Sequence, residues 1–220
     1  MERLFRWTAS PIWARVVPFA VLLILTGLQG RLGEASTYWV YVLKTVVAAG
    51  LVWSARRAIP EIQWRFSWEA VAAGILVLLL WVGLDGYYPK AGSEGPIWNP
   101  LTAFSNRTVG WFFVAVRLAG STLLIPVLEE VFYRSLVYRY LMRKDFEAVP
   151  LRTFAWVPLL VTCGLFAAEH REWLPGFLCG LIFQGLVLRK NRLGDAIMAH
   201  AITNCLLGVW VVWSGQWRFW

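Results

Sequence analysis

Charge is scarce in this sequence. Only 15% of its 220 residues are Asp, Glu, Lys or Arg, whereas 59% are hydrophobic and the mean hydropathy is +0.57. Globular soluble domains carry about 25% charged residues, so this composition excludes that class and predicts an integral membrane protein. The chain shows no internal repeat and no soluble second domain. We therefore expect one membrane domain over residues 1–220, with N-terminal spans in residues 1–107 and a motif-bearing core in residues 108–214.

Cysteine is also scarce. Cys163, Cys179 and Cys205 lie in apolar, helix-like sequence without the spacing of a metal site. We interpret them as small core residues, which excludes a disulfide framework and a cysteine nucleophile. Acidic residues are fewer than basic ones, which gives a net charge of +8. The basic residues fall in short clusters between apolar runs, as in the cytoplasmic loops of multi-pass proteins, so the expected partner is the lipid bilayer and not a nucleic acid.

Apolar runs predict an all-α, multi-pass bundle of seven or eight transmembrane helices. The expected spans are Ile12–Gln29, Tyr38–Ser54, Glu69–Leu84, Thr108–Leu128 with a helical continuation through Met142, Thr153–Ala168, Trp173–Leu188 and Gly194–Ser214. Proline removes a helix hydrogen bond, so a kink or break is expected at Pro126. The number of spans is seven if the kinked segment crosses once, and eight if the part after Pro126 is a separate helix. A cleaved signal peptide is disfavoured, because no small-residue cleavage site follows the first span.

The distribution of basic residues predicts the topology. With seven crossings, one side collects most of them: Arg3, Arg6, Arg15, Arg56, Arg57, Arg65, Arg139, Arg143, Lys144, Arg152, Arg189, Lys190 and Arg192. The other side collects Arg31, Lys90, Arg107, Arg171 and Arg218. Because cytoplasmic loops are enriched in Lys and Arg, the N-terminus is expected in the cytoplasm. We expect the membrane to be a bacterial or archaeal plasma membrane.

The most informative segment is Glu129–Arg134, which places two carboxylates and an arginine inside membrane-like sequence. A charge near the bilayer centre costs roughly 3 kcal/mol on insertion scales, so such groups need partners and usually have a function. Glu130 and Arg134 are four residues apart, with the acid first, which favours an ion pair on one helix face. Glu129 points roughly 100° away around the helix and is left for another purpose.

The only two histidines, together with one asparagine, are the other polar residues of interest. His170 follows an expected span, and His200 and Asn204 share one face of the last span because they are four residues apart. If the bundle brought them to Glu129, a polar intramembrane cavity would hold a base, two imidazoles and an amide donor. A carboxylate in such a cavity can take a proton from water, and the donors can stabilise an oxyanion, which is the chemistry of hydrolysis.

Structural interpretations remain open for each residue alone. An interfacial histidine, an asparagine that joins helices and a structural Glu130–Arg134 pair are all common in membrane proteins. One carboxylate with two histidines would also make a workable zinc site. However, no single helix carries two ligands at metal-site spacing, so we expect no metal and no other cofactor.

The three motifs together resemble the CPBP (CAAX protease and bacteriocin-processing, or Abi) family of intramembrane endopeptidases. They are Glu-Glu-x-x-x-Arg, Phe-x-x-x-His and His-x-x-x-Asn, in this order between about Pro126 and Asn204. The family usually has glycine after the motif arginine, where this chain has Ser135. The first hundred residues carry no part of the resemblance. The CAAX-protease-related proteins that accompany exosortase systems in bacteria are one branch to which the chain could belong.

The resemblance implies a role for each motif residue. Glu129, helped by His170, would activate the attacking water, and His200 and Asn204 would form the oxyanion site, while Glu130 and Arg134 would shape the cavity. It also implies that, as in glutamic peptidases, the chemical step needs no metal. The expected substrate is a membrane-associated or lipidated protein or peptide. The alternatives are a non-catalytic protein of the same fold, such as a bacteriocin-immunity or scaffold factor, and a transporter, which the lack of a repeat disfavours.

Overall fold

The computed structural model describes residues 7–92, 95 and 97–220, and within them it contains helices and turns but no strand. Among these residues, four helices are long and apolar enough to cross a membrane: Pro11–Leu28, Ser36–Ala58, Arg107–Tyr140 and Gly194–Ser214. Trp68–Gly83 and Trp156–Ala168 are shorter apolar helices. The prediction of an all-α integral membrane protein is confirmed, whereas the count of seven or eight spans stays a prediction.

The chain groups into two compact units, each made of separate stretches of sequence. The first unit comprises Met1–Ala58, Gly95–Leu128 and Asn204–Trp220, and the second comprises Ile59–Glu94 and Glu129–Thr203. Helices α6 (Ile125–Glu130) and α10 (Gly194–Ser214) contribute residues to both units. This grouping does not test whether the chain is a single domain, which stays a prediction.

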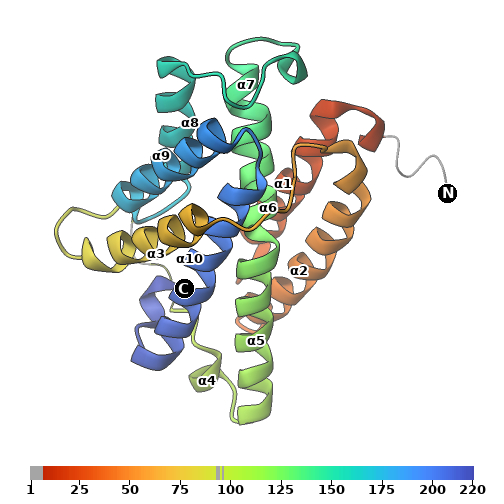
Figure 1. The fold of residues 1–220 in the computed structure, drawn as a ribbon. Helices are drawn as coiled ribbons and strands as arrows, with labels where there is room; N and C mark the ends of the chain where they lie inside the picture. The colour runs from red at the N-terminus through yellow and green to blue at the C-terminus, as the bar shows by residue number, and fades with distance from the viewer. Residues whose placement is uncertain (1–6, 93–94, 96) are drawn as a thin grey trace. The chain divides into compact units, whose positions relative to one another are not determined.

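The first unit is built on three long helices. Its elements are α1 (Pro11–Leu28), α2 (Ser36–Ala55), the 3-10 turn η2 (Arg56–Ala58), α4 (Pro100–Ala103), α5 (Arg107–Leu123) and the 3-10 turn η5 (Trp217–Phe219). Helix α1 begins where the Ser10 hydroxyl accepts from the Trp13 N–H with Pro11 at the first position, a favourable N-terminus. Helix α1 packs on α2, and α2 packs on α5 (Figure 1). A cluster of Tyr38, Trp98 and Phe113 forms an aromatic core in this unit.

The second unit carries the motif residues. Its elements are α3 (Trp68–Gly83), the π-helix η3 (Val131–Val137), α7 (Tyr138–Tyr140), the 3-10 turn η4 (Phe146–Ala148), α8 (Trp156–Ala168) and α9 (Trp173–Lys190). Helices α8 and α9 lie side by side, and α3 packs on α9 (Figure 1). A Cβ added at Gly180 would lie 3.1 Å from the side chain of Cys163, so glycine allows α8 and α9 to approach closely. All three cysteines are free, and Cys163 and Cys179 are buried, as predicted for core residues.

The helix that leads to the motif acids is interrupted, as the proline predicted. Helix α5 ends at Leu123, and α6 starts at Ile125, next to Pro126. The seven residues that follow α6 form a π-helix, which the sequence did not predict. π-helical segments are rare in proteins, and those that occur are often found at functional sites. The irregular backbone therefore lies on both sides of Glu129 and Glu130.

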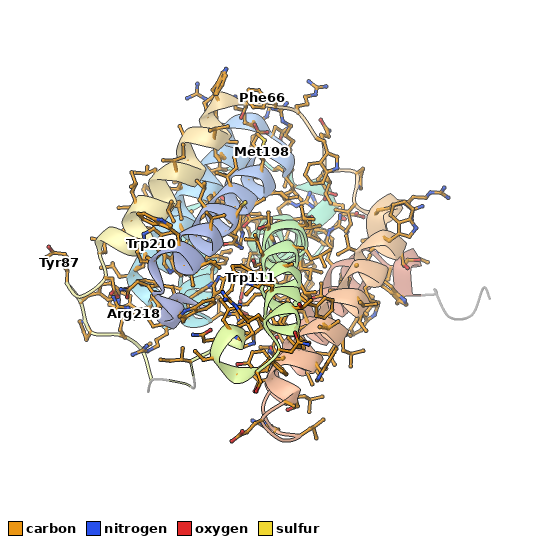
Figure 2. All side chains as sticks on the ribbon, turned by 90° about the horizontal axis from the view of Figure 1, so that it is seen from below. Phe66, Tyr87, Trp111, Met198, Trp210 and Arg218 are labelled. Carbon is orange, nitrogen blue, oxygen red and sulfur yellow. The ribbon has the colours of Figure 1, made fainter. Side chains whose placement is uncertain are left out.

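Many large apolar side chains point outward from the helices. Examples are Trp13, Trp39, Leu79, Trp156 and Trp213, each more than half exposed. In Figure 2, Phe66 and Tyr87 also project away from the ribbon, at the start of α3 and in the loop that follows it. Exposed apolar surface on this scale suits a protein whose helices face lipid, because apolar lipid tails contact such side chains without the free-energy cost of exposure to water.

Candidate active site

The two adjacent acids close helix α6, and both are buried. Glu129 is 8% exposed and Glu130 is 0% exposed. Nε of Arg134, on the π-helix, lies 3.1 Å from Oε2 of Glu130, which confirms the predicted ion pair. The contact lacks hydrogen-bond geometry, and the guanidinium nitrogens have no hydrogen bond within the described residues. The guanidinium lies over the Phe166 ring at 4.6 Å, so charge and stacking hold it in place.

The other oxygen of Glu130 holds His200, which is buried on α10. Nδ1 of His200 lies 3.0 Å from Oε1 of Glu130. Because a carboxylate only accepts, this contact assigns the hydrogen to Nδ1. The second nitrogen, Nε2, lies 3.9 Å from Oε2 of Glu129 and becomes a donor only when the imidazole is protonated. Glu130 therefore connects two cationic or potentially cationic groups, Arg134 and His200, through its two oxygens.

His170 lies in the short turn between α8 and α9. Its Nδ1 is 2.8 Å from the carbonyl oxygen of Phe166, so Nδ1–H donates and the lone pair remains on Nε2. The ring packs against Trp81 at 5.3 Å and Phe166 at 4.9 Å. Burial, the largest influence, lowers the pKa of His170 from 6.5 to about 4, although the hydrogen bond to Phe166 opposes this. The imidazole is therefore neutral at ordinary pH, and its Nε2 can accept a hydrogen bond.

Phe166 is the common neighbour of the site residues. Its ring contacts Tyr133 at 5.4 Å, His170 at 4.9 Å and His200 at 6.1 Å, in addition to Arg134. The motif phenylalanine thus packs between the segments that supply the polar groups. The structure brings Glu129, Glu130, Arg134 and both histidines into one region of the second unit.

Two of the predicted site residues are not in the contacts that their expected roles would suggest. Glu129 and His170 make no hydrogen bond with each other within the described residues, and Oε2 of Glu129 is a buried acceptor without a hydrogen-bond partner there. Asn204 belongs to the first unit, and its amide donates to the carbonyl oxygen of Ser121 at 2.9 Å. Its role in an oxyanion site therefore stays a prediction.

Sequence reasoning missed one pair of residues at this site. The Tyr133 hydroxyl donates a hydrogen bond to the carboxylate of Glu169. Glu169 is exposed, whereas Tyr133 is only 3% exposed, so the pair extends from the buried region to the surface. The charge of Glu169 also acts on Glu129. Two signals in the sequence could have found the pair: Tyr133 follows Glu129 by four residues, and Glu169 directly precedes His170.

The site contains carboxylates and imidazoles, which are the side chains that bind zinc. Within the described part of the chain, no group of three or more His, Cys, Asp or Glu side chains is arranged to hold a metal ion. The expected absence of a metal in the reaction stays a prediction.

Part of the chain matches a known protein family. Residues 110–206 match the family model described as type II CAAX prenyl endopeptidase Rce1-like. The matched segment contains all three motifs and each of the six predicted site residues. Neither the curated proteins nor the solved structures provide a match to the chain.

Proposed function

Because the chain belongs to the CPBP family of CAAX-protease-like membrane proteins, we propose that it is an intramembrane endopeptidase. It hydrolyses a peptide bond in a membrane-associated or lipidated protein or peptide. The observation that carries the proposal is the Glu129 carboxylate, buried with an unpartnered oxygen and facing Nε2 of His200 at 3.9 Å. A buried carboxylate beside an imidazole is a pair that can take up and deliver a proton.

In the proposed reaction, Glu129 acts as the general base. A water molecule attacks the peptide carbonyl carbon, and its proton passes to the Glu129 carboxylate. The C–N bond then breaks, and the same proton is delivered to the leaving amine. The neutral His170, with the lone pair on Nε2, orients the water or shares this proton. The products are a carboxylic acid and an amine, so one water molecule is consumed for each peptide bond that is hydrolysed.

His200 supplies the positive charge at the developing oxyanion. Its Nδ1–H donates to the Glu130 carboxylate, and an imidazolium at this position presents a second N–H at Nε2, on the side of Glu129. Preorganised donors of this kind contribute about 10²–10³-fold to hydrolysis in other enzymes. Arg134 pairs with the other oxygen of the Glu130 carboxylate. Asn204, one turn further along α10, is the proposed second donor.

The Tyr133–Glu169 pair has a positioning role in this proposal. The hydrogen bond fixes the end of α8 against the π-helix, and this end carries both Phe166 and His170. The orientation of the His170 ring thus depends on groups that do not contact the substrate. Cytoplasmic orientation of the N-terminus, a bacterial or archaeal plasma membrane and the exosortase-associated branch remain parts of the proposal.

Comparative proteomics of membrane fractions tests the function. We expect a deletion strain to accumulate a membrane-anchored peptide or protein in its uncleaved form. The terminus that cleavage creates should be absent from this strain. Complementation with the wild-type gene should restore the terminus, Glu129→Gln should not, and Glu34→Gln, an exposed loop residue, should restore it as a matched control. If Glu129→Gln complements fully, the protein acts without catalysis, as an immunity or scaffold factor would.

A further expectation concerns metal ions. The purified protein should keep full activity after exhaustive treatment with a strong chelator, because the proposed base is a carboxylate that needs only hydrogen-bond partners. A zinc enzyme would lose activity and regain it with added zinc, since its ligands hold the activated water. Elemental analysis of the same preparation provides the second readout. One zinc per chain whose removal stops turnover would make His170 and His200 ligands and replace the proposed mechanism.

A further inference from the structure

The first unit contains a second polar cluster that the proposed reaction does not use. It lies on α2 and α5, and its cations are Lys44 and Arg117. The ammonium of Lys44 is 4.4 Å and the guanidinium of Arg117 is 5.2 Å from the centre of the same ring, Tyr41. Two cations in apolar membrane helices thus lie close to each other, which is electrostatically unfavourable unless an anion is present.

Aromatic rings surround the guanidinium. The Arg117 guanidinium carbon lies 4.5 Å from the ring centre of Trp98 and 5.3 Å from that of Trp220, in addition to Tyr41. These rings contact the cation through their π faces, and such contacts are strongest where water is excluded. They do not occupy its N–H donors, which lie in the guanidinium plane. The carbonyl oxygen of Arg117 accepts a hydrogen bond from the Tyr41 hydroxyl at 3.3 Å, whereas its guanidinium makes no hydrogen bond or ion pair among the described residues.

The first unit is also nearly devoid of acids. Among its described residues, Glu34 is the only one with a carboxylate side chain, and it is exposed in the loop between α1 and α2. The oxygens that hold Lys44 are neutral: the Thr26 hydroxyl at 3.1 Å and the Gln29 amide oxygen at 2.6 Å. The charge of both cations is therefore not balanced by a side chain in the described part of this unit.

We infer that Lys44 and Arg117, with the rings around Arg117, form a binding site for an anion of the phosphate class, presented as an anionic lipid headgroup or as a free ion. A guanidinium binds phosphate through two parallel N–H···O bonds, and these are the donors left unused here. The nearby ammonium adds a second charge for the same group.

Thermal unfolding of the purified full-length protein in detergent tests this site. Three additives are titrated: dioleoylphosphatidylglycerol, dioleoylphosphatidylcholine and inorganic phosphate. The anionic lipid should raise Tm by roughly 5–10 °C at about a hundredfold excess over its Kd, because a ligand that binds only the folded state stabilises it. Arg117→Lys, which keeps the charge but loses the paired donors, should weaken this binding roughly tenfold. Arg107→Gln, an exposed position on the same helix, should leave it unchanged.

The three additives distinguish the sources of the anion. A shift with phosphatidylglycerol alone assigns a lipid headgroup, and a shift with inorganic phosphate as well assigns a small-anion site. Equal shifts with the zwitterionic and anionic lipids, or no shift with any additive, would overturn the inference. An unchanged Kd in Arg117→Lys would do the same, and native mass spectrometry of retained lipid checks each result independently. None of these measurements depends on peptidase activity.

Discussion

Glu129→Gln is expected to lower kcat/KM by at least about 10²–10⁴-fold, the contribution typical of a positioned general base. The amide has nearly the same shape as the carboxylate but cannot accept a proton. The side chain is 8% exposed, and its Oε2 has no hydrogen-bond partner in the described residues, so the substitution breaks no observed hydrogen bond at that oxygen. The rate is measured on the membrane peptide that accumulates in the deletion strain, with Glu34→Gln as the exposed acid control.

The histidines provide the companion test of the same prediction. His170→Ala and His200→Ala should each reduce turnover strongly, and combining either with Glu129→Gln should add little, because groups that act as a unit are not additive. All variants should remain inserted in the membrane, with detergent melting recorded for each. Normal turnover in Glu129→Gln would eliminate the glutamate mechanism, and multiplicative losses in the double variants would show that the residues act separately.

The ion pair at the centre of the site was predictable because it depends on local geometry. Glu130 and Arg134 need only a helix between them, and the four-residue spacing supplies it whatever the surrounding fold. The apolar runs predicted the long helices for the same reason, since composition and length define a membrane helix. Pro126 likewise predicted the break between α5 and α6, because proline has no N–H to donate to the helix.

The π-helix could not be predicted from periodicity. Val131–Val137 has the apolar pattern of an ordinary helix, and the choice between i→i+4 and i→i+5 bonding depends on tertiary contacts. One such contact joins Arg139 and the carboxylate of Glu61, a residue distant in sequence that also binds Ser135. The sequence identified the charges on this segment but gave no information about how the backbone presents them.

The position of His170 was the second unpredictable feature. Depth counting along a full-length span would leave this histidine near the far end of its helix. Instead, α8 has only 13 residues, and the turn after it folds so that His170 bonds to Phe166 and packs on Trp81. The contact with α3, which carries Trp81, is long-range and has no signature in the motif. The sequence therefore identified His170 as a candidate but could not predict the residues that contact it. The Tyr133–Glu169 pair was missed for the same reason, because it joins two separate segments.

Arg134→Ala is expected to lower the free energy of unfolding by roughly 3–5 kcal/mol, because it leaves Oε2 of the fully buried Glu130 without its guanidinium partner. Detergent thermal melting should drop by about 10 °C or more. Arg143→Ala is the matched control: its partner Asp145 lies 3.8 Å away, but both side chains are about two-thirds exposed, so little change is expected. Replacing both charges, in Glu130→Gln with Arg134→Met, should recover part of the loss, since no buried charge is then stranded. Melting of Arg134→Ala equal to that of Arg143→Ala would show that the buried pair does not stabilise the fold.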